Sequence, residues 1–144
     1  MRTRKTRKPR VAIQFAVPRR GLPGAASFRR WANGASGITL RIVGAREGLS
    51  LNRRYRGRRR ATNVLTFDTG DIVLCHPVIA REARAQGKTL AAHYAHLVVH
   101  GILHLRGYDH EKKRDALRME RREVAMLRRL GFADPYTLES PHPP

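Results

Sequence analysis

The sequence predicts a single domain built on a small mixed β-sheet with helices packed on it. Its apolar residues form four short β-like runs and five helical patterns, in the chain order β-α-β-α-β-β-α-α-α. The chain has 144 residues, of which 41% are apolar, and this is enough for one hydrophobic core. No apolar run reaches the roughly 18 residues that a membrane span needs. A wholly disordered basic chain and a membrane protein are therefore both excluded.

The first half of the chain alternates strands and helices. In chain order we expect a strand at 11–17, a helix from Pro23 to Gly34, a strand at 38–43 and a short helix carrying Leu49, Leu51 and Asn52. The run at 53–60 contains six arginines and a glycine, so it is too charged to lie in the core.

The second half contains a hairpin followed by three helices. We expect strands at 62–67 and 71–75 joined by a turn at Thr69-Gly70, and helices at 77–86, 90–105 and 112–130. Glycines at 107 and 131 are placed to end the last two helices. The predicted organisation is a basic mobile arm at 1–10, one domain at 11–135 and a C-terminal tail at 136–144.

The charge of the chain points to a nucleic-acid partner. The formal net charge is +19, and 25 of the 30 basic residues are arginine. A guanidinium grips phosphate through two donors, and a strongly basic surface binds nucleic acid by releasing counterions. A codon-biased composition is the alternative explanation. Cys75 is the only cysteine, so an internal disulfide and a multi-cysteine metal site are excluded, and a reducing, cytoplasmic location is expected.

The segment from His100 to His110 carries the most specific chemical pattern. His100 and His104 are four residues apart, so on a helix their imidazoles lie on one face and can approach a common metal. Gly107 can end the helix in a left-handed conformation, which lets the chain reverse and bring His110 back toward the pair. Three neutral nitrogen ligands suit Zn²⁺ and leave a fourth position open for catalysis. The alternative is that these are ordinary helix and loop histidines.

Other polar residues near this segment receive plainer interpretations. A zinc peptidase places a glutamate directly after the first histidine, and this chain has Gly101 there, so peptide hydrolysis is disfavoured. Asp109 is either an orienting partner of a ligand imidazole or a turn residue. The remaining groups are expected to be structural: His76, His93, His96 and His142 as sheet-facing or solvent residues, Cys75 as a buried apolar residue, and Glu111, Glu120 and Glu123 as ion-pair partners on the last helix.

Several motifs together resemble the YbeY family of single-strand endoribonucleases, which are rRNA maturation factors. The matching stretches are Leu51-Asn52-Arg53-Arg54-Tyr55-Arg56-Gly57, Thr62-Asn63-Val64-Leu65-Thr66-Phe67, Gly70-Asp71-Ile72, the segment from His100 to His110, and Pro135-Tyr136. The histidine segment matches the family pattern HGxLHLxGYDH at every fixed position. Asn63, Thr66 and Asp68 depart from the family, where aspartate, serine and proline are usual.

The resemblance implies an α+β fold with a four-stranded sheet and a metal site in a cleft lined by basic residues. It implies that His100, His104 and His110 bind one zinc ion and that Arg56 is the catalytic arginine. Physics agrees with that role, because an arginine aimed at a phosphodiester neutralises the charge that develops in the transition state. Without the resemblance, Arg56 could not be chosen over Arg53, Arg54 or Arg58.

The resulting hypothesis is a zinc-dependent endoribonuclease that cuts single-stranded RNA. By resemblance, it acts on the 3′ end of 16S rRNA and in ribosome quality control, with ribosomal RNA, the small ribosomal subunit and a ribosomal protein as expected partners and no membrane partner. Two alternatives from other classes are a non-catalytic RNA-binding assembly factor with a structural zinc, and a metallopeptidase.

Overall fold

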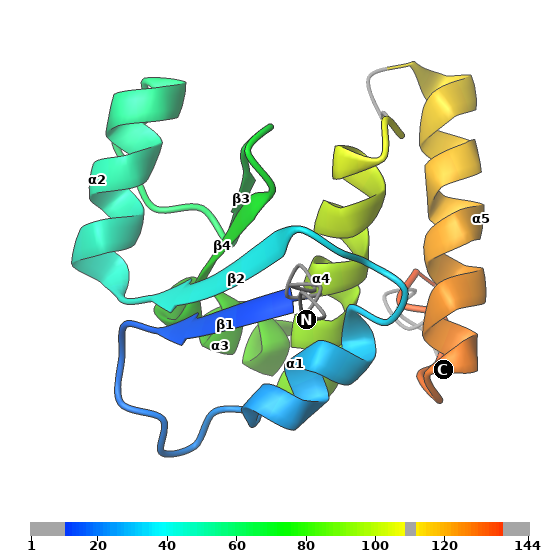
Figure 1. Cartoon of the computed structure of the whole chain (residues 1–144), viewed down its shortest axis with the longest axis horizontal. Coiled ribbons are helices and arrows are strands. Elements are labelled where there is room, and N and C mark those ends of the chain that lie inside the picture. The colour runs from blue at the N-terminus through cyan, green and yellow to red at the C-terminus, as the bar shows by residue number, and fades with distance from the viewer. Residues whose placement is uncertain (1–10, 109–111, 137–144) are drawn as a thin grey trace, which may run out of the picture.

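The computed structural model describes residues 11–108 and 112–136. Its strands are β1 (Val11–Phe15), β2 (Ile38–Val43), β3 (Val64–Thr66) and β4 (Asp71–Cys75). Its helices are α1 (Ala25–Trp31), α2 (Ala45–Arg56), α3 (His76–Gln86), α4 (Leu90–Leu105) and α5 (Lys113–Arg129). The predicted order of elements and the predicted α+β class are both confirmed (Figure 1). The arm at 1–10 and the chain beyond 136 lie outside the described residues.

The four strands form one mixed sheet in the order β1-β2-β4-β3. The pairs β1–β2 and β2–β4 are parallel, whereas β3 and β4 form the antiparallel hairpin that the sequence predicts. Its turn closes with a bond from the Gly70 amide to the Phe67 carbonyl, at 2.9 Å. This topology places the short strand β3 at one edge of the sheet and β1 at the other.

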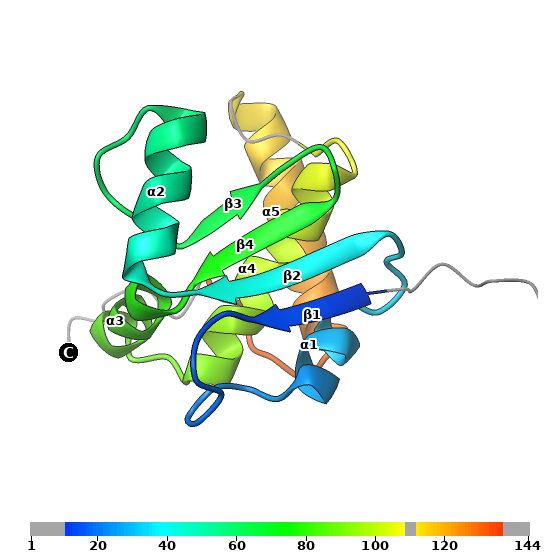
Figure 2. The same ribbon diagram turned by 60° about the vertical axis from the view of Figure 1, so that its left-hand side comes forward.

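Side chains that alternate between the two faces of the sheet form two separate hydrophobic clusters. Leu40, Ile42, Ile72 and Leu74 belong to the main core, together with Phe28 and Trp31 of α1 and buried residues of α4 and α5. The second and smaller cluster, on the face that α2 covers, contains Val43, Leu65, Val73, Cys75 and Val78. Figure 2 shows the two layers, with α4 and α5 behind the sheet and α2 apart from them. Cys75 is buried, as predicted.

The boundaries of several elements differ from the sequence prediction, most of all those of α2 and β3. The short helix expected around Leu51 is a 12-residue helix, α2, and it includes the first part of the arginine run, which is exposed. Arg53, Arg54 and Arg56 occupy its last turn, where cations interact favourably with the helix dipole. The strand expected at 62–67 is reduced to three residues. Among the described helices, none is both long enough and apolar enough to cross a bilayer.

Candidate functional site

Helix α4 presents the predicted histidine pair. It begins after Thr89, whose side-chain oxygen accepts a hydrogen bond from the Ala92 amide at 3.0 Å, and runs for 16 residues. Most of its surface is buried against the sheet and α5, and His100 and His104 lie one turn apart on its less buried side. The apolar faces that dock the helix therefore also determine where the two imidazoles can point.

The C-terminal end of α4 has the geometry that the sequence predicts. Gly107 has a φ of +98°, and its amide donates to the His104 carbonyl at 3.1 Å. The Tyr108 amide donates to the Leu103 carbonyl at 3.1 Å, which completes a Schellman motif and ends the helix. The following segment holds Asp109 and the third predicted ligand, His110, and these two residues lie outside the described part of the chain.

One pocket brings together residues that are far apart in the sequence. It has a volume of about 250 Å³ and is lined by Arg56, Val64, Leu65, Thr66, His100 and His104. Three elements form it: the end of α2, the edge strand β3 and the C-terminal half of α4. The predicted catalytic arginine and two of the three predicted ligands therefore share a single pocket.

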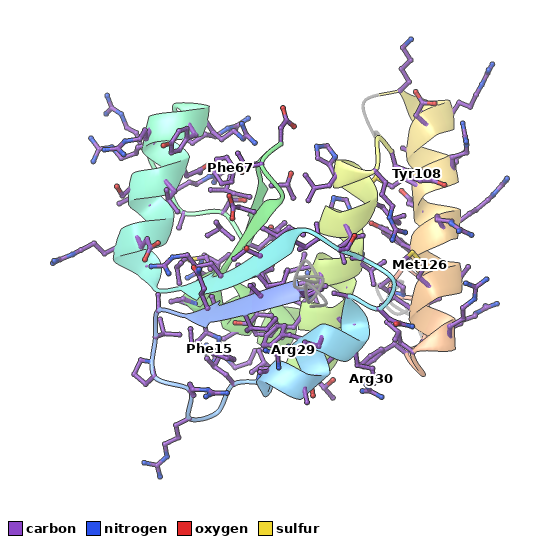
Figure 3. All side chains as sticks on the ribbon, in the orientation of Figure 1. Phe15, Arg29, Arg30, Phe67, Tyr108 and Met126 are labelled. Carbon is purple, nitrogen blue, oxygen red and sulfur yellow. The ribbon has the colours of Figure 1, made fainter. Side chains whose placement is uncertain are left out.

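Arg56 is held in place although its side chain is exposed. It is the last residue of α2, and the next residue, Gly57, adopts a left-handed conformation with a φ of +67°. Its Nη2 donates to the Thr66 carbonyl of β3 at 3.0 Å, and its Cζ lies 5.8 Å from the centre of the Phe67 ring. Figure 3 shows Phe67 between α2 and β3. This anchoring distinguishes Arg56 from its neighbours in the arginine run.

A buried carboxylate orients the histidine side of the pocket. Glu123 of α5 is 0% exposed, and its Oε2 bonds to Nδ1 of His100. Its Oε1 accepts a hydrogen bond from the Tyr136 hydroxyl and lies 3.5 Å from Nε2 of His96. Burial by itself would raise the pKa of Glu123, but hydrogen bonds from His100, His96 and Tyr136 outweigh it and lower the pKa to about 2. Glu123 is therefore ionised near neutral pH.

The structure corrects the interpretation of Glu123 and His96. Glu123 pairs with histidines of α4 and not with cations of its own helix, and His96 packs against Tyr136 rather than facing the sheet or solvent. A sequence signal existed for Glu123, because the buried residues of α5 are Met119, Glu123 and Leu127 at a spacing of four. A carboxylate on an apolar stripe needs a buried partner.

A second polar cluster lies near the N-terminal end of α4, about two turns before His100. His93 is 4% exposed, and its Nε2 bonds to Oε1 of Glu82 at 2.8 Å. The same oxygen accepts a hydrogen bond from Nδ2 of Asn63 at 2.9 Å. The sequence missed this cluster too, because its members come from α3, α4 and the segment before β3. Asparagine suits position 63 in this chain, since an aspartate there would place a second carboxylate beside Glu82.

The donor chemistry of the pocket fits the predicted metal. Imidazole nitrogens are good zinc ligands, and a carboxylate on Nδ1 of His100 selects the tautomer that binds a metal through Nε2. Within residues 11–108 and 112–136, no three His, Cys, Asp or Glu side chains form a metal-binding group. His110, the third ligand that the sequence predicts, lies outside these residues.

Gly101 has a packing role that explains why no glutamate follows His100. A Cβ built there would lie 3.1 Å from Cδ1 of Ile72 and 3.3 Å from Cγ2 of Thr66. The position faces the sheet and not the pocket, and α4 approaches so closely that a side chain would push it away. A glutamate at this position, as in a zinc peptidase, would press on the side chains of Ile72 and Thr66.

The fold and the pocket together define a class of small α+β domain, in which a histidine-bearing helix and an arginine from another helix face one pocket beside a sheet edge. The chain belongs to the YbeY family, because residues 22–131 match the family model described as Endoribonuclease YbeY. The resemblance noted from the sequence motifs is thereby confirmed.

Curated relatives extend over almost the whole chain. Proteins named Endoribonuclease YbeY from Stenotrophomonas maltophilia and Nitrosomonas eutropha are 50% and 49% identical to it, and each alignment covers 90% of this chain. The alignments cover 94% and 99% of those proteins. A solution structure from Thermotoga maritima aligns with 84% of this chain and 91% of that one, at 24% identity and a TM-score of 0.49.

Proposed function

We propose that the protein is a zinc-dependent endoribonuclease that cuts single-stranded RNA. The observation that carries this proposal is the single pocket in which Arg56 meets His100 and His104. The family membership and the names of the relatives support RNA cleavage. The net charge of +19 supports a polyanionic substrate.

Each residue of the pocket has a distinct role in this proposal. Arg56, anchored by the Thr66 carbonyl, holds the phosphodiester and neutralises the charge that develops on its oxygens. His100 and His104, with His110, hold the metal, and Glu123 orients His100. A zinc ion bound there would supply a Lewis acid at the phosphodiester.

The proposed biological substrate is ribosomal RNA. By family resemblance, the enzyme matures the 3′ end of 16S rRNA in the cytoplasm, takes part in ribosome quality control and works with the small ribosomal subunit and a ribosomal protein. The lone cysteine is consistent with a reducing compartment. Comparing the 16S rRNA 3′ ends of a depleted strain and a complemented strain tests this assignment, and mature ends in the depleted strain would contradict it.

The test of the activity compares wild type with His104→Ala on single-stranded RNA and on casein, each with and without a chelator, alongside zinc analysis. Zinc-containing wild type should cut RNA, while chelator and His104→Ala should stop cutting and leave RNA binding intact. RNA binding without cutting by wild type would favour the assembly factor, and casein cleavage without RNA cleavage would favour the peptidase. Cutting by metal-free protein would overturn the assignment of the metal site.

The ends of the cut RNA identify the attacking group. A 2′,3′-cyclic phosphate product would identify it as the neighbouring 2′-hydroxyl.

A further inference from the structure

A larger basic cavity adjoins the histidine pocket. It has a volume of about 680 Å³, within the size range of small-molecule sites. Its lining consists of Asn52, Arg56, Arg58, Arg60, Ala61, Thr62, Asn63, Val64, Leu65, Val78, Arg81 and Glu82. It shares Arg56, Val64 and Leu65 with the histidine pocket, so the two hollows meet at Arg56.

The charged groups of this cavity are arranged for an anion. Arg58 and Arg60 come from the loop after α2, Arg81 comes from α3, and Arg56 stands at the boundary with the histidine pocket. Among the described residues that line the cavity, Glu82 is the only carboxylate, and it is already bonded to Asn63 and His93. The guanidiniums therefore outweigh it, and such a group of like charges is stabilised when an anion lies among them.

A buried side chain holds the arginine loop in place. Asn52 is 3% exposed, and its side-chain Nδ2 donates to the Arg60 backbone carbonyl. The backbone carbonyl of Asn52 accepts from the Arg58 backbone amide at 3.3 Å. These two bonds tie the loop to α2 over the cavity. The positions of the arginines are thus partly organised before any ligand arrives, which lowers the entropic cost of binding.

The lining favours recognition of a phosphate–sugar backbone over recognition of bases. Val64, Leu65 and Val78 supply its apolar surface, and no aromatic side chain is among the described residues that line it. Base readout by stacking needs aromatic faces, whereas arginines without them bind phosphates of any sequence. Because the cavity is continuous with the histidine pocket at Arg56, a nucleic-acid strand that crosses Arg56 would occupy both.

We propose that this cavity is a subsite for the backbone phosphates next to the RNA bond that is cut, with Arg58, Arg60 and Arg81 as its phosphate-binding residues. That the ligand is RNA rests on the proposed function. The subsite adds the direction in which the RNA leaves the pocket, along β3 toward α3, and three residues that act in binding rather than in chemistry.

The test compares two variants of the full chain with equal loss of charge. The first is Arg58→Gln/Arg60→Gln/Arg81→Gln, and the matched control is Arg20→Gln/Arg29→Gln/Arg30→Gln. All six side chains are exposed, and Figure 3 shows Arg29 and Arg30 at α1, away from α2. The affinity for a short single-stranded 2′-O-methyl RNA is measured by fluorescence anisotropy as a function of salt, and thermal melting checks folding.

The subsite predicts a specific change in salt dependence. The slope of log affinity against log salt should fall by about 0.7 for each lost phosphate contact, or about 2 in the triple variant, and affinity at low salt should drop at least roughly tenfold. The control should stay near the wild-type slope. Equal slopes in the two triple variants would overturn the proposal. Loss of affinity for a polyglutamate peptide but not for RNA would overturn it as well, because the cavity would then belong to an acidic protein.

Cleavage kinetics separate this proposal from the proposed function. The triple variant should raise KM for a long RNA with little change in kcat, and the single variant Arg81→Glu should act in the same direction if the triple variant folds poorly. Unchanged KM in an enzyme that cuts RNA would overturn the subsite alone. If wild type cuts nothing but the two salt slopes still differ, the proposed function fails while the phosphate subsite stands.

Discussion

The two walls of the pocket are built in opposite ways. On the α4–α5 side, the carboxylate of Glu123 is fully buried and bonds to His100 and Tyr136. On the α2–β3 side, Arg58, Arg59 and Arg60 are exposed on a loop that Asn52 ties to α2. A buried carboxylate and its hydrogen bonds are hardly screened by salt and set an orientation, whereas exposed arginines attract a polyanion at long range, and this attraction weakens as salt rises. The buried side therefore fixes the orientation of the histidines, and the exposed side attracts the substrate.

Arg56 is the exception on the exposed wall, and its replacement gives the largest expected effect. Arg56→Lys keeps a positive charge but loses the fork that bonds to Thr66, so kcat for RNA cleavage should fall by about 10²- to 10³-fold. Arg54→Lys is the matched control, since Arg54 lies on the same helix turn and lines neither hollow. Equal losses in both variants would remove the distinction between an anchored arginine and its neighbours.

The buried wall can be tested at Glu123. Glu123→Gln keeps the shape of the side chain but removes the charge that orients His100, so zinc affinity should fall by about 10- to 100-fold. Glu120→Gln on the same helix is the control. Competition with a chromophoric chelator measures affinity, and the ¹⁵N chemical shifts of His100 report its tautomer without any cleavage assay. If both stay as in wild type, Glu123 only supports packing.

The stability of the cluster formed by Asn63, Glu82 and His93, at the larger basic cavity, should depend on its charge. Asn63→Asp replaces a donor to Glu82 with a second carboxylate and should lower the free energy of unfolding by about 1 kcal/mol, a modest value because the Glu82 side chain is 32% exposed. Combining it with Glu82→Gln should restore most of the loss, because an amide can donate to the new carboxylate. Chemical denaturation of the two single variants and the double variant tests the coupling.

The smallest effect concerns pH. Burial lowers the pKa of His93, although its hydrogen bond with Glu82 opposes the shift. The unfolded chain then binds more protons, so stability should fall as pH drops through about 6.5 and stop falling below the folded pKa. His93→Gln should flatten this slope in thermal melts between about pH 7 and 5. The slope that remains belongs to other groups such as His76, whose pKa burial also lowers. An unchanged slope would show that His93 titrates alike in both states.

Local patterns predicted the order of the elements and the placement of His100 and His104 one turn apart on one helix. The limits of α4 were predicted to the residue because Thr89 caps it and Gly107 ends it through short-range bonds. The length of α2 was underestimated, because its arginine-rich last turn has too little apolar periodicity to indicate a helix. Glu123 was misinterpreted, because its partners lie on a different helix and no local spacing connects them.

The sequence by itself determined that His100 and His104 share a helical face, that Gly107 ends the helix after them, and that the motifs are those of the YbeY family. These properties depend on bonds between residues at most about five apart, or on matches of residue type, and need no knowledge of packing. Only the tertiary structure decided that Arg56 reaches the Thr66 carbonyl at the same pocket and that Glu123 lies against His100. Those contacts join separate elements, so they depend on how α2, α4 and α5 pack against the sheet and one another, which no local spacing in the sequence sets.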